Sequence, residues 1–421
     1  MKLYTADRVL TEDSGACHEP GAVLVDETTV AWVGPVTEFP ATAYPADLPV
    51  QPLPGTTLMP GLIDAHVHLG FDGGPQPVAR MTAESDALQM ALMLRSAREL
   101  LSVGVTTARD LGARGYLDLA VRQAVRAGTA RGPRLLTSGS PLTVTGGHCW
   151  FMGGEADSTD DLRRLVRRHH KAGVDLIKVM STGGFMTEGS APWHAQYGLE
   201  QLQVVVAEAH RLGKRVAAHA HGVEGIERAL AAGVDTLEHL SFVHLDGRHE
   251  VVPELVDRIA ASPAYVSPTV SFQAPRLAEL TDGLLTPALE QLYRSGCRII
   301  ASTDAGIDHT PHHGFAGALS AMVHFGMPPA EVITSATSRS AEALGIEDLT
   351  GRLRVGLEAD LIAVAGDPRL DIGALADLRL VVARGREFTP DPLPALDPLE
   401  LATLPRFIRE MIDDMTRGAG D

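Results

Sequence analysis

Hydrophobic and polar positions follow three different patterns along the chain. The first 57 residues carry short, often alternating apolar segments separated by Gly and Pro, which is typical of β-strands. From about residue 58 to 345, apolar runs rich in Val, Ile, Thr and Ala alternate with stretches whose apolar residues recur at helical spacing. From about residue 350 the β pattern returns. A Pro-rich stretch from residue 391 then leads into a helical pattern and a polar end.

The middle segment repeats a strand and a helix. Its candidate strands lie at 57–70, 106–112, 134–140, 175–184, 215–222, 235–241, 265–270 and 298–306. Candidate helices lie at 117–128, 159–173, 199–213, 223–233 and 253–261, and several of them end in Gly, a C-cap signal. Alternating strands and helices predict a parallel sheet, and eight units over this length fit a closed (β/α)8 barrel. A doubly wound open sheet is the main alternative, but no GxGxxG sequence follows a first strand.

The predicted fold is therefore α/β, with a TIM barrel and a small second domain. We expect the barrel to span 58–345. The β segments 1–57 and 346–390 bracket it in the sequence, so they are expected to combine into a composite β-sandwich domain. Residues 391–421 are expected to form a C-terminal helical extension.

Composition excludes several classes of protein. The 421 residues include 36 Lys and Arg against 53 Asp and Glu, a net charge of −17, which argues against a nucleic-acid partner. Three cysteines (Cys17, Cys149 and Cys297) are too few and too scattered for a disulfide framework or a CxxC metal site. The first residues lack the apolar stretch of a signal peptide, and no apolar run is long enough to span a membrane. We therefore expect a soluble cytoplasmic protein with no membrane partner.

Histidine is unusually frequent, with 17 residues. His66 and His68 are two apart in a candidate strand, so their side chains point to the same face and could bind one metal ion. An isolated pair of this kind is weak evidence, because two hydrogen-bonded histidines explain it equally well.

Other polar residues stand at the ends of the candidate strands. His219 and His221 end the fifth strand, His239 the sixth and Asp304 the eighth, while Lys178 lies within the fourth. The C-terminal ends of barrel strands carry the active site in essentially every characterised TIM-barrel enzyme. Buried histidines at separate places would each need a hydrogen-bond partner, whereas a shared metal centre satisfies them together. The pattern favours a metal centre.

Lys178 lies in an apolar strand, where burial disfavours its charge and lowers its pKa. A neutral amine can react with carbon dioxide to give a carbamate, an anionic ligand whose two oxygens can bridge two metal ions. An ordinary lysine paired with a carboxylate is the alternative. The neighbouring histidines and Asp304 favour the carbamate.

The order and placement of these residues resemble the amidohydrolase superfamily. The match includes HVH at 66–68, Lys178, His219, His239 and the aspartate of STDAG, and MPGLIDAHVH, TTARDLG and GLEADLIAV extend it over nearly the whole chain. The chain looks most similar to the binuclear branch that holds Xaa-Pro dipeptidase (prolidase)-like and arginine-carboxypeptidase-like enzymes, with imidazolonepropionase more distant. The resemblance implies that His66, His68 and Asp304 bind one divalent ion, that His219 and His239 bind a second, and that carboxylated Lys178 bridges them.

Such a centre implies hydrolysis. Two ions that share a water lower its pKa towards neutrality, and the resulting bridging hydroxide attacks a carbonyl that one ion polarises. Asp304 is expected to accept the proton and pass it to the leaving amine. Nitrogen and oxygen ligands with a hydrolytic task favour Zn²⁺, with Mn²⁺ or Co²⁺ as alternatives.

Two further histidines are candidates for catalysis. His148, after the third strand, is placed to hydrogen-bond the oxyanion or the substrate, although a structural loop histidine is an equal alternative. His221 shares a face with His219 and is expected to line the pocket. Dipeptidase-like relatives often carry Tyr at this position, so the departure argues against simple dipeptides.

Several other residues have weaker evidence for a role in the site. Tyr197 fits a packing role better than a pocket role, and Cys149 has no base arranged beside it. His309, His312 and His313 follow the eighth strand, where they either shape the pocket or belong to a solvated loop.

The sequence thus predicts a metal-dependent amidohydrolase that cleaves an amide or peptide C–N bond in a small acylated or peptidic substrate. Hydrolysis of a cyclic amide, carbamate, ester or phosphoester stays open, as does peptide processing in natural-product (bottromycin-type) maturation. A non-catalytic metal-binding barrel is disfavoured because the ligand set is intact. Relatives often associate, so a homo-oligomer is an open expectation.

Overall fold

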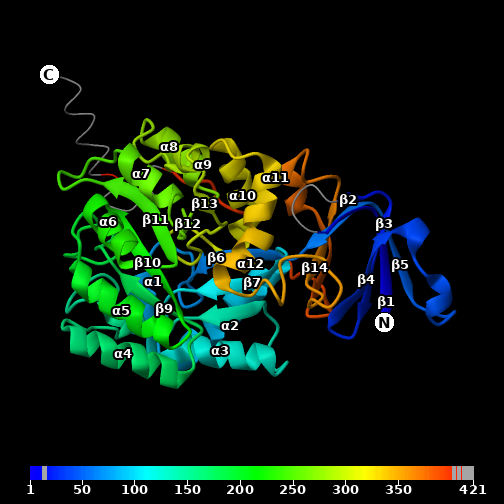
Figure 1. The fold of residues 1–421 in the computed structure, drawn as a ribbon, viewed down its shortest axis with the longest axis horizontal. Coiled ribbons are helices and arrows are strands. Elements are labelled where there is room, and N and C mark those ends of the chain that lie inside the picture. The colour runs from blue at the N-terminus through cyan, green and yellow to red at the C-terminus, as the bar shows by residue number, and fades with distance from the viewer. Residues whose placement is uncertain (12–16, 401–403, 405–408, 410–421) are drawn as a thin grey trace.

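The computed structural model describes residues 1–11, 17–400, 404 and 409. It is elongated, with a β sheet at one end and a larger α/β region at the other (Figure 1). Both terminal segments of the chain contribute to the sheet, and the segment between them forms the α/β region.

The terminal sheet contains eight strands in the order β16-β15-β14-β5-β1-β3-β4, with β2 paired to β1. Their bounds are β1 Lys2–Leu10, β2 Cys17–His18, β3 Gly21–Asp26, β4 Thr29–Pro35, β5 Val50–Pro60, β14 Leu361–Ala365, β15 Leu378–Ala383 and β16 Arg386–Phe388. Neighbouring residues of β1 face opposite sides, since Leu3 packs with Ala22 and Leu24 while Tyr4 packs in a different apolar cluster. Each face of the sheet therefore has its own small core.

The strands of the expected β-sandwich are hydrogen-bonded into one continuous sheet that folds back on itself, since the hydroxyl of Tyr4 in β1 donates to the carboxylate of Glu387 in β16, four strands away in the sheet order. The cause of this continuity is β5, which is eleven residues long. Its residues Val50–Leu53, with Thr57 and Leu58, pair with β1, and its residues Thr56–Pro60 pair with β14. The strands from the two ends of the chain therefore continue each other.

The α/β region contains two parallel sheets, β6-β7-β8 and β13-β12-β11-β10-β9. The bounds are β6 Leu62–Val67, β7 Val105–Asp110, β8 Arg134–Thr137, β9 Leu176–Met180, β10 Arg215–Gly222, β11 Thr236–Val243, β12 Tyr265–Ser267 and β13 Arg298–Ile299. Each of the eight candidate strands of the middle segment overlaps one of them. The α/β class with parallel strands is confirmed.

The five candidate helices are also present, as α3 Leu117–Arg126, α4 Thr159–Ala172, α5 Leu199–Arg211, α6 Val223–Ala232 and α7 Pro253–Ala260. The ends of α4 follow from its sequence. Ser158 and Asp161 form a reciprocal capping box at its start, and Gly173 takes a φ of 94° at its end, a conformation that favours glycine.

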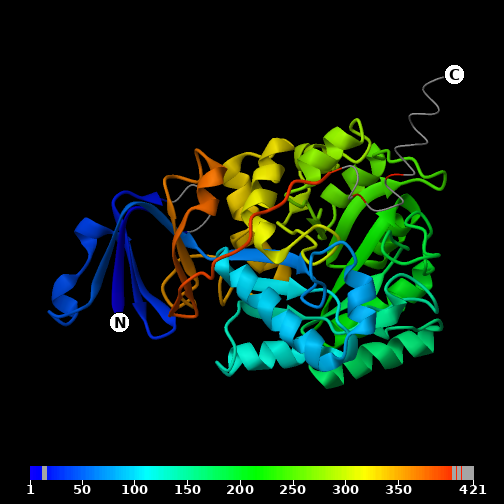
Figure 2. The ribbon, with the colours of Figure 1, turned by 180° about the vertical axis from the view of Figure 1, so that it is seen from behind.

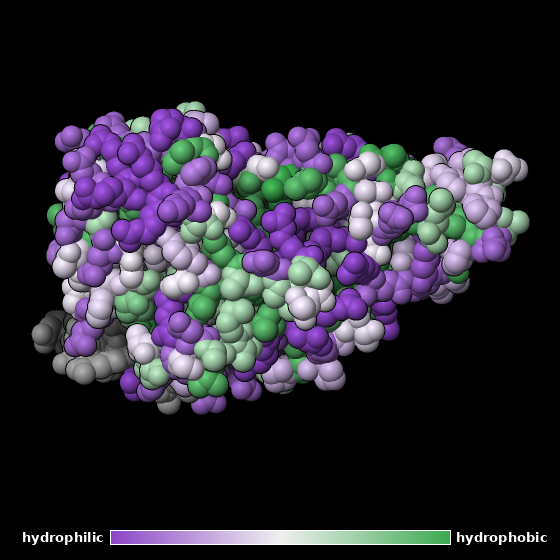
Figure 3. Space-filling model, turned by 90° about the horizontal axis from the view of Figure 1, so that it is seen from below, coloured by the Kyte–Doolittle hydropathy of each residue, from purple (hydrophilic) through white to green (hydrophobic). Residues whose placement is uncertain are grey.

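Further helices complete the region. These are α1 Pro77–Ala83, α2 Asp86–Ser102, α8 Ala274–Leu280, α9 Leu289–Arg294, α10 Phe315–His324, α11 Pro329–Ser335 and α12 Ser338–Leu344. Among the described residues, none of the helices combines the length and the apolar character needed to cross a bilayer. On the face seen from below, hydrophobic residues occur in scattered groups between hydrophilic ones (Figure 3).

The predicted C-terminal helical extension is only partly covered by the structure. Residues 391–400 contain no helix and run as an irregular segment across the α/β region towards α8 (Figure 2). The rest of that prediction lies outside the described residues, apart from positions 404 and 409.

Candidate metal centre

Strand ends of the two parallel sheets bring the predicted site residues together. β6 carries His66 and is followed at once by His68, while β10 carries His219 and His221. β11 carries His239 and β9 carries Lys178. Asp304 lies five residues beyond the last residue of β13, Ile299. All seven side chains line one cavity of about 740 Å³.

One cluster consists of His66, His68 and Asp304. The two Nε2 atoms are 3.3 Å apart, and Oδ1 of Asp304 lies 3.2 Å from Nε2 of His66 and 3.1 Å from Nε2 of His68. The backbone holds the arrangement, because Asp304 N–H donates to the carbonyl of His66 and His68 N–H donates to the carbonyl of Ala305. Three potential ligand atoms therefore converge on one point.

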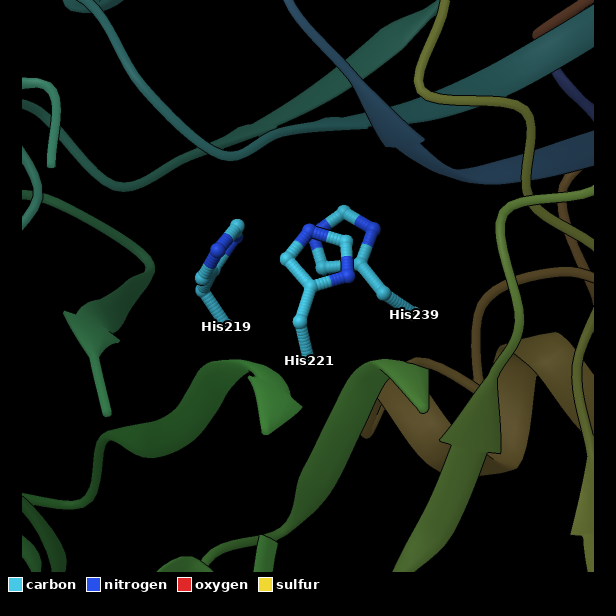
Figure 4. Close-up of side chains that lie close together, drawn as sticks. All are labelled: His219, His221 and His239. Atoms are coloured by element: carbon cyan, nitrogen blue, oxygen red, sulfur yellow. The ribbon is translucent and has the colours of Figure 1, made fainter. Parts of the chain in front are cut away.

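The second cluster consists of His219, His221 and His239. The ring centroids are 4.5 to 4.6 Å apart, and the rings of His221 and His239 are nearly parallel with His219 set at an angle to both (Figure 4). Nε2–H of His219 donates to the carbonyl of Gly183, which leaves Nδ1 of that ring as a lone-pair donor. The two clusters adjoin, since the rings of His66 and His239 are 5.0 Å apart.

The backbone is strained at one residue of each cluster. Asp304 has a φ of 61° and His239 a φ of 72°, in the left-handed region that side-chain-bearing residues rarely adopt. Such conformations cost of order 1–3 kcal/mol each and concentrate at functional sites. The chain keeps this strain at two of the positions that the sequence assigns as ligands.

A buried network orients His66. Its Nδ1–H donates to Oε2 of Glu238 at 2.9 Å, and Oε1 of Glu238 accepts from Nη2 of Arg109 at 2.9 Å. Because Nδ1 carries the proton, Nε2 presents a bare lone pair to Asp304. Burial raises the pKa of Glu238, but Arg109 and His66 outweigh it and hold that pKa well below its usual range. Glu238 is therefore a carboxylate that fixes the orientation and tautomer of His66.

Asp64 links the strand of His66 to the residue before Asp304 through buried hydrogen bonds. Its carboxylate accepts from the backbone N–H of His66 and of Thr303 and from the hydroxyl of Thr303. These bonds join β6 to the residue that precedes Asp304. Burial raises the pKa of Asp64 to about 7.

Burial and charge set the protonation states of the site. Burial raises the pKa of Asp304, but His66 and His68 outweigh it and hold the pKa well below its usual range. Burial, followed by the neighbouring imidazoles, lowers the pKa of His219 and of His239 well below the usual value. Burial lowers the pKa of Lys178 to about 8. His219 and His239 are therefore neutral lone-pair donors at pH 7, while Asp304 is an anion.

Several of these buried atoms have no hydrogen-bond partner within the described residues. They are Nδ1 of His68, Nζ of Lys178, Nε2 of His239 and Oδ1 of Asp304. Buried polar atoms without partners are costly, and a cluster of them is rare in a folded protein. Neutral imidazoles beside a carboxylate are a donor set that divalent transition metals prefer. The residues present therefore fit the metal centre that the sequence predicts.

His148 and His221 both line the cavity. The ring of His148 lies 4.6 Å from that of His219, and burial lowers its pKa to about 3. The His148 ring packs directly against Gly184, since any other residue at position 184 would place its Cβ 2.5 Å from that ring. Burial also lowers the pKa of His221 to about 3, and its Nδ1 is 2.8 Å from the hydroxyl of Ser241. His221 therefore belongs to the second cluster, whereas the sequence predicted a place in the wall of the pocket.

Some of the remaining candidates line the cavity and others pack away from it. Tyr197 is fully buried away from the cavity and donates to the carbonyl of Ala156, a packing role. His309 lines the cavity, whereas His312 packs behind it, with Nε2 bonded to the carbonyl of His68. Burial raises the pKa of the Cys149 thiol to about 12, so it stays protonated and is no nucleophile. Glu238, Arg109 and Asp64 were assigned no role from the sequence. Their charges within apolar strands are the feature that could have identified them.

Comparison with known proteins agrees with this site. The family model described as "Amidohydrolase family" matches residues 57–391. An ochratoxinase from Aspergillus niger is 31% identical over 398 residues, covering 86% of this chain and 80% of that protein. An imidazolonepropionase from Pseudomonas fluorescens is 26% identical, covering 86% of this chain and 93% of that protein. The crystal structure of a Xaa-Pro dipeptidase with bound methionine in the active site superposes with a TM-score of 0.79 at 28% identity, covering 92% of this chain and 99% of that one.

The chain belongs to the amidohydrolase family. The prediction of an enzyme that hydrolyses carbon–nitrogen bonds is thereby confirmed, as is the resemblance to prolidase-like and imidazolonepropionase-like members.

Replacing Glu238 with Gln tests the orienting network. The amide keeps the shape but loses the charge that fixes the Nδ1 proton of His66, so we expect zinc affinity to fall by about 10–100-fold. Competition with a chelator of known affinity measures this, and circular dichroism checks the fold. The matched control is Glu224→Gln, which removes a half-exposed carboxylate paired with Arg228 on α6. Equal zinc affinity in Glu238→Gln and wild type would contradict the role.

Proposed function

We propose that the protein is a metal-dependent amidohydrolase that cleaves an amide or peptide C–N bond in a small acylated or peptidic substrate. The observation that carries the proposal is the group of buried ligand atoms on Lys178, His239 and Asp304 that line the cavity and have no hydrogen-bond partner among the described residues. Similarity to an ochratoxinase and a Xaa-Pro dipeptidase supports the same class of bond.

The proposed ligand set follows the two clusters. His66, His68 and Asp304 would hold one divalent ion, His219 and His239 would hold the other, and Lys178, carboxylated on Nζ, would connect them. A buried amine with no partner and a pKa near 8 is a suitable nucleophile towards carbon dioxide. When bound, the ions polarise the substrate carbonyl and activate water, and Zn²⁺ suits this donor set.

Residues of the chain carry out the proton transfer and the hydrogen bonding to the substrate. Asp304 is an anion at neutral pH beside the histidines, so it can accept a proton from the attacking water at a carboxylate oxygen. It returns that proton to the leaving nitrogen as the C–N bond breaks. His148, neutral and with Nδ1 unpartnered, can donate a hydrogen bond to the substrate oxygen. His221, whose ring lies 4.9 Å from that of Phe185, would contact the substrate.

We also propose that the two parallel sheets form one closed (β/α)8 barrel over residues 58–345, with 1–57 and 346–390 as a composite β domain. Backbone hydrogen bonds across both gaps support closure. Ala65 donates to Ala301 at 3.0 Å between the first and eighth strands, and Leu142 donates to Lys178 at 2.8 Å between the third and fourth.

A hydrolysis screen tests the function directly. The zinc-loaded protein is offered N-acyl amino acids, dipeptides, lactams and carbamates, and product amines are quantified. We expect turnover of at least one amide class that disappears on chelation and returns with zinc. No turnover of any amide by fully loaded protein would contradict the proposal.

Lys178→Ala tests the bridging carbamate. Without the amine, we expect metal content to fall from two ions per chain towards one, and short carboxylic acids such as propionate to restore part of it. Elemental analysis of dialysed protein measures the content. Lys171→Ala, an exposed position on α4, is the matched control. Full metal content in Lys178→Ala would refute the carbamate.

Asp304→Asn tests the proton transfer. The amide cannot accept the proton, so kcat is expected to drop by about 10²–10⁴-fold with a much smaller change in KM. Steady-state kinetics on protein whose metal content has been matched to wild type gives both values. Asp160→Asn, at a largely exposed side chain, serves as control. A kcat within a few-fold of wild type would exclude Asp304 as the shuttle.

A further inference from the structure

The cavity extends well beyond the histidine clusters. Its volume of about 740 Å³ lies in the upper part of the range for sites that enclose drug-sized ligands. The reacting carbonyl needs only the part beside Asp304 and the histidines. The remainder of the cavity therefore has to accommodate the parts of the substrate that do not react.

Two groups of apolar side chains line this remainder. The first is next to the histidines, where the Phe71 ring is 5.5 Å from that of His68 and the Phe185 ring is 4.9 Å from that of His221. The second, here called the leucine wall, consists of Leu277, Leu284, Leu285, Leu399 and Leu404. Except for Leu284, its members form an apolar cluster separate from the one that contains Phe71.

The leucine wall is assembled from distant parts of the chain. Leu277 lies on α8 and Leu285 follows it, whereas Leu399 and Leu404 come from the C-terminal segment that crosses to α8 in Figure 2. Leu399, in the irregular segment 391–400, and Leu404 are both buried, with 6% and 2% of their surface exposed.

Specific bonds hold the segment in place. The side-chain amide of Gln273 donates to the carbonyl of Asp397 at 2.8 Å and accepts from the N–H of Leu399 at 3.1 Å. Nearer the sheet, the guanidinium of Arg98 pairs with the carboxylate of Asp391 at 2.6 Å. One glutamine thus satisfies two backbone groups of the segment and fixes Leu399 at the cavity.

The described cavity-lining residues around the leucine wall are uncharged. The guanidinium of Arg276, which donates to the carbonyl of Leu399 and pairs with Glu279, does not line the cavity. The other cavity-lining residues of α8, α9 and the stretch between them are Gln273, Ala274, Gly283, Thr286, Pro287, Ala288 and Gln291. Among the described residues that line the cavity, Lys178 is the one lysine or arginine. A buried carboxylate would find no cationic partner at this end among the described residues that line the cavity, which makes its desolvation costly, whereas an apolar group gains from burial.

We propose that the C-terminal segment completes a specificity pocket, and that the preferred substrate is an amide whose uncharged, bulky apolar group packs against Leu285 and Leu399. This rests on the proposed function, because it assigns the non-reacting part of the same substrate. Binding energy gained there holds the amide beside Asp304, so the pocket raises kcat/KM for bulky substrates.

Matched amides test the pocket in the zinc-loaded, full-length protein. One series keeps the amine constant and changes the acyl group from acetyl to 2-naphthoyl, and the other keeps acetyl constant and changes methylamine to 2-naphthylamine. We expect kcat/KM to be about a hundredfold higher for the naphthyl member of at least one series. A 6-carboxy-naphthyl analogue of nearly the same shape is expected to lose most of that preference.

Variants assign the preference to the leucine wall. Leu399→Ala and Leu285→Ala are each expected to reduce the naphthyl-over-small ratio about tenfold, and Leu370→Ala, 84% exposed, is expected to leave it unchanged. Two wall variants from different segments guard against one that misfolds.

The outcomes separate the two proposals. Turnover of small and naphthyl amides at equal kcat/KM, a preference for the carboxylated analogue, or a ratio untouched by both wall variants would overturn the specificity pocket and leave the amidohydrolase proposal standing. Failure to hydrolyse any amide would overturn the amidohydrolase proposal itself.

Discussion

The constraint on which the site depends is the burial of unpartnered polar atoms at the ends of parallel strands. Lys178, His68, His239 and Asp304 each bury an atom with no hydrogen-bond partner among the described residues. Each such atom costs about 1–3 kcal/mol, and two residues of the clusters add backbone strain. A divalent cation at each cluster, with Lys178 carboxylated between them, would satisfy the atoms of Lys178, His239 and Asp304 together, which would explain why the fold tolerates them.

The surrounding structure maintains this arrangement with charge. Arg109 compensates Glu238, Glu238 fixes the proton of His66, and Asp64 joins the strand of His66 to the residue before Asp304. Because each bond constrains the next, the bare nitrogen of His66 depends on Arg109, which is two contacts away. The same cavity then extends to the leucine wall, so chemistry and specificity are built from different parts of the chain.

The sequence predicted the α/β region well because periodicity and caps are local signals. All eight strands of the middle segment and five of its helices were recognisable, and Gly173 marked the end of α4. The continuity of the sheet of the terminal segments was not predictable, since only three-dimensional pairing reveals that β5 bridges β1 and β14. Spacing placed His66, His68 and Asp304 near each other. It missed Glu238 and the contact of Leu399 with α8, because these depend on side-chain direction and on residues more than 100 positions apart.

The central claim is that two metal ions occupy adjoining clusters of this cavity. Crystals of the zinc-loaded protein, with diffraction recorded above and below the zinc absorption edge, test it most directly. The account predicts two anomalous peaks per chain, one between His66, His68 and Asp304 and one beside His219 and His239. A zinc-loaded crystal with no anomalous peak at either cluster, or with zinc bound only elsewhere, would contradict it.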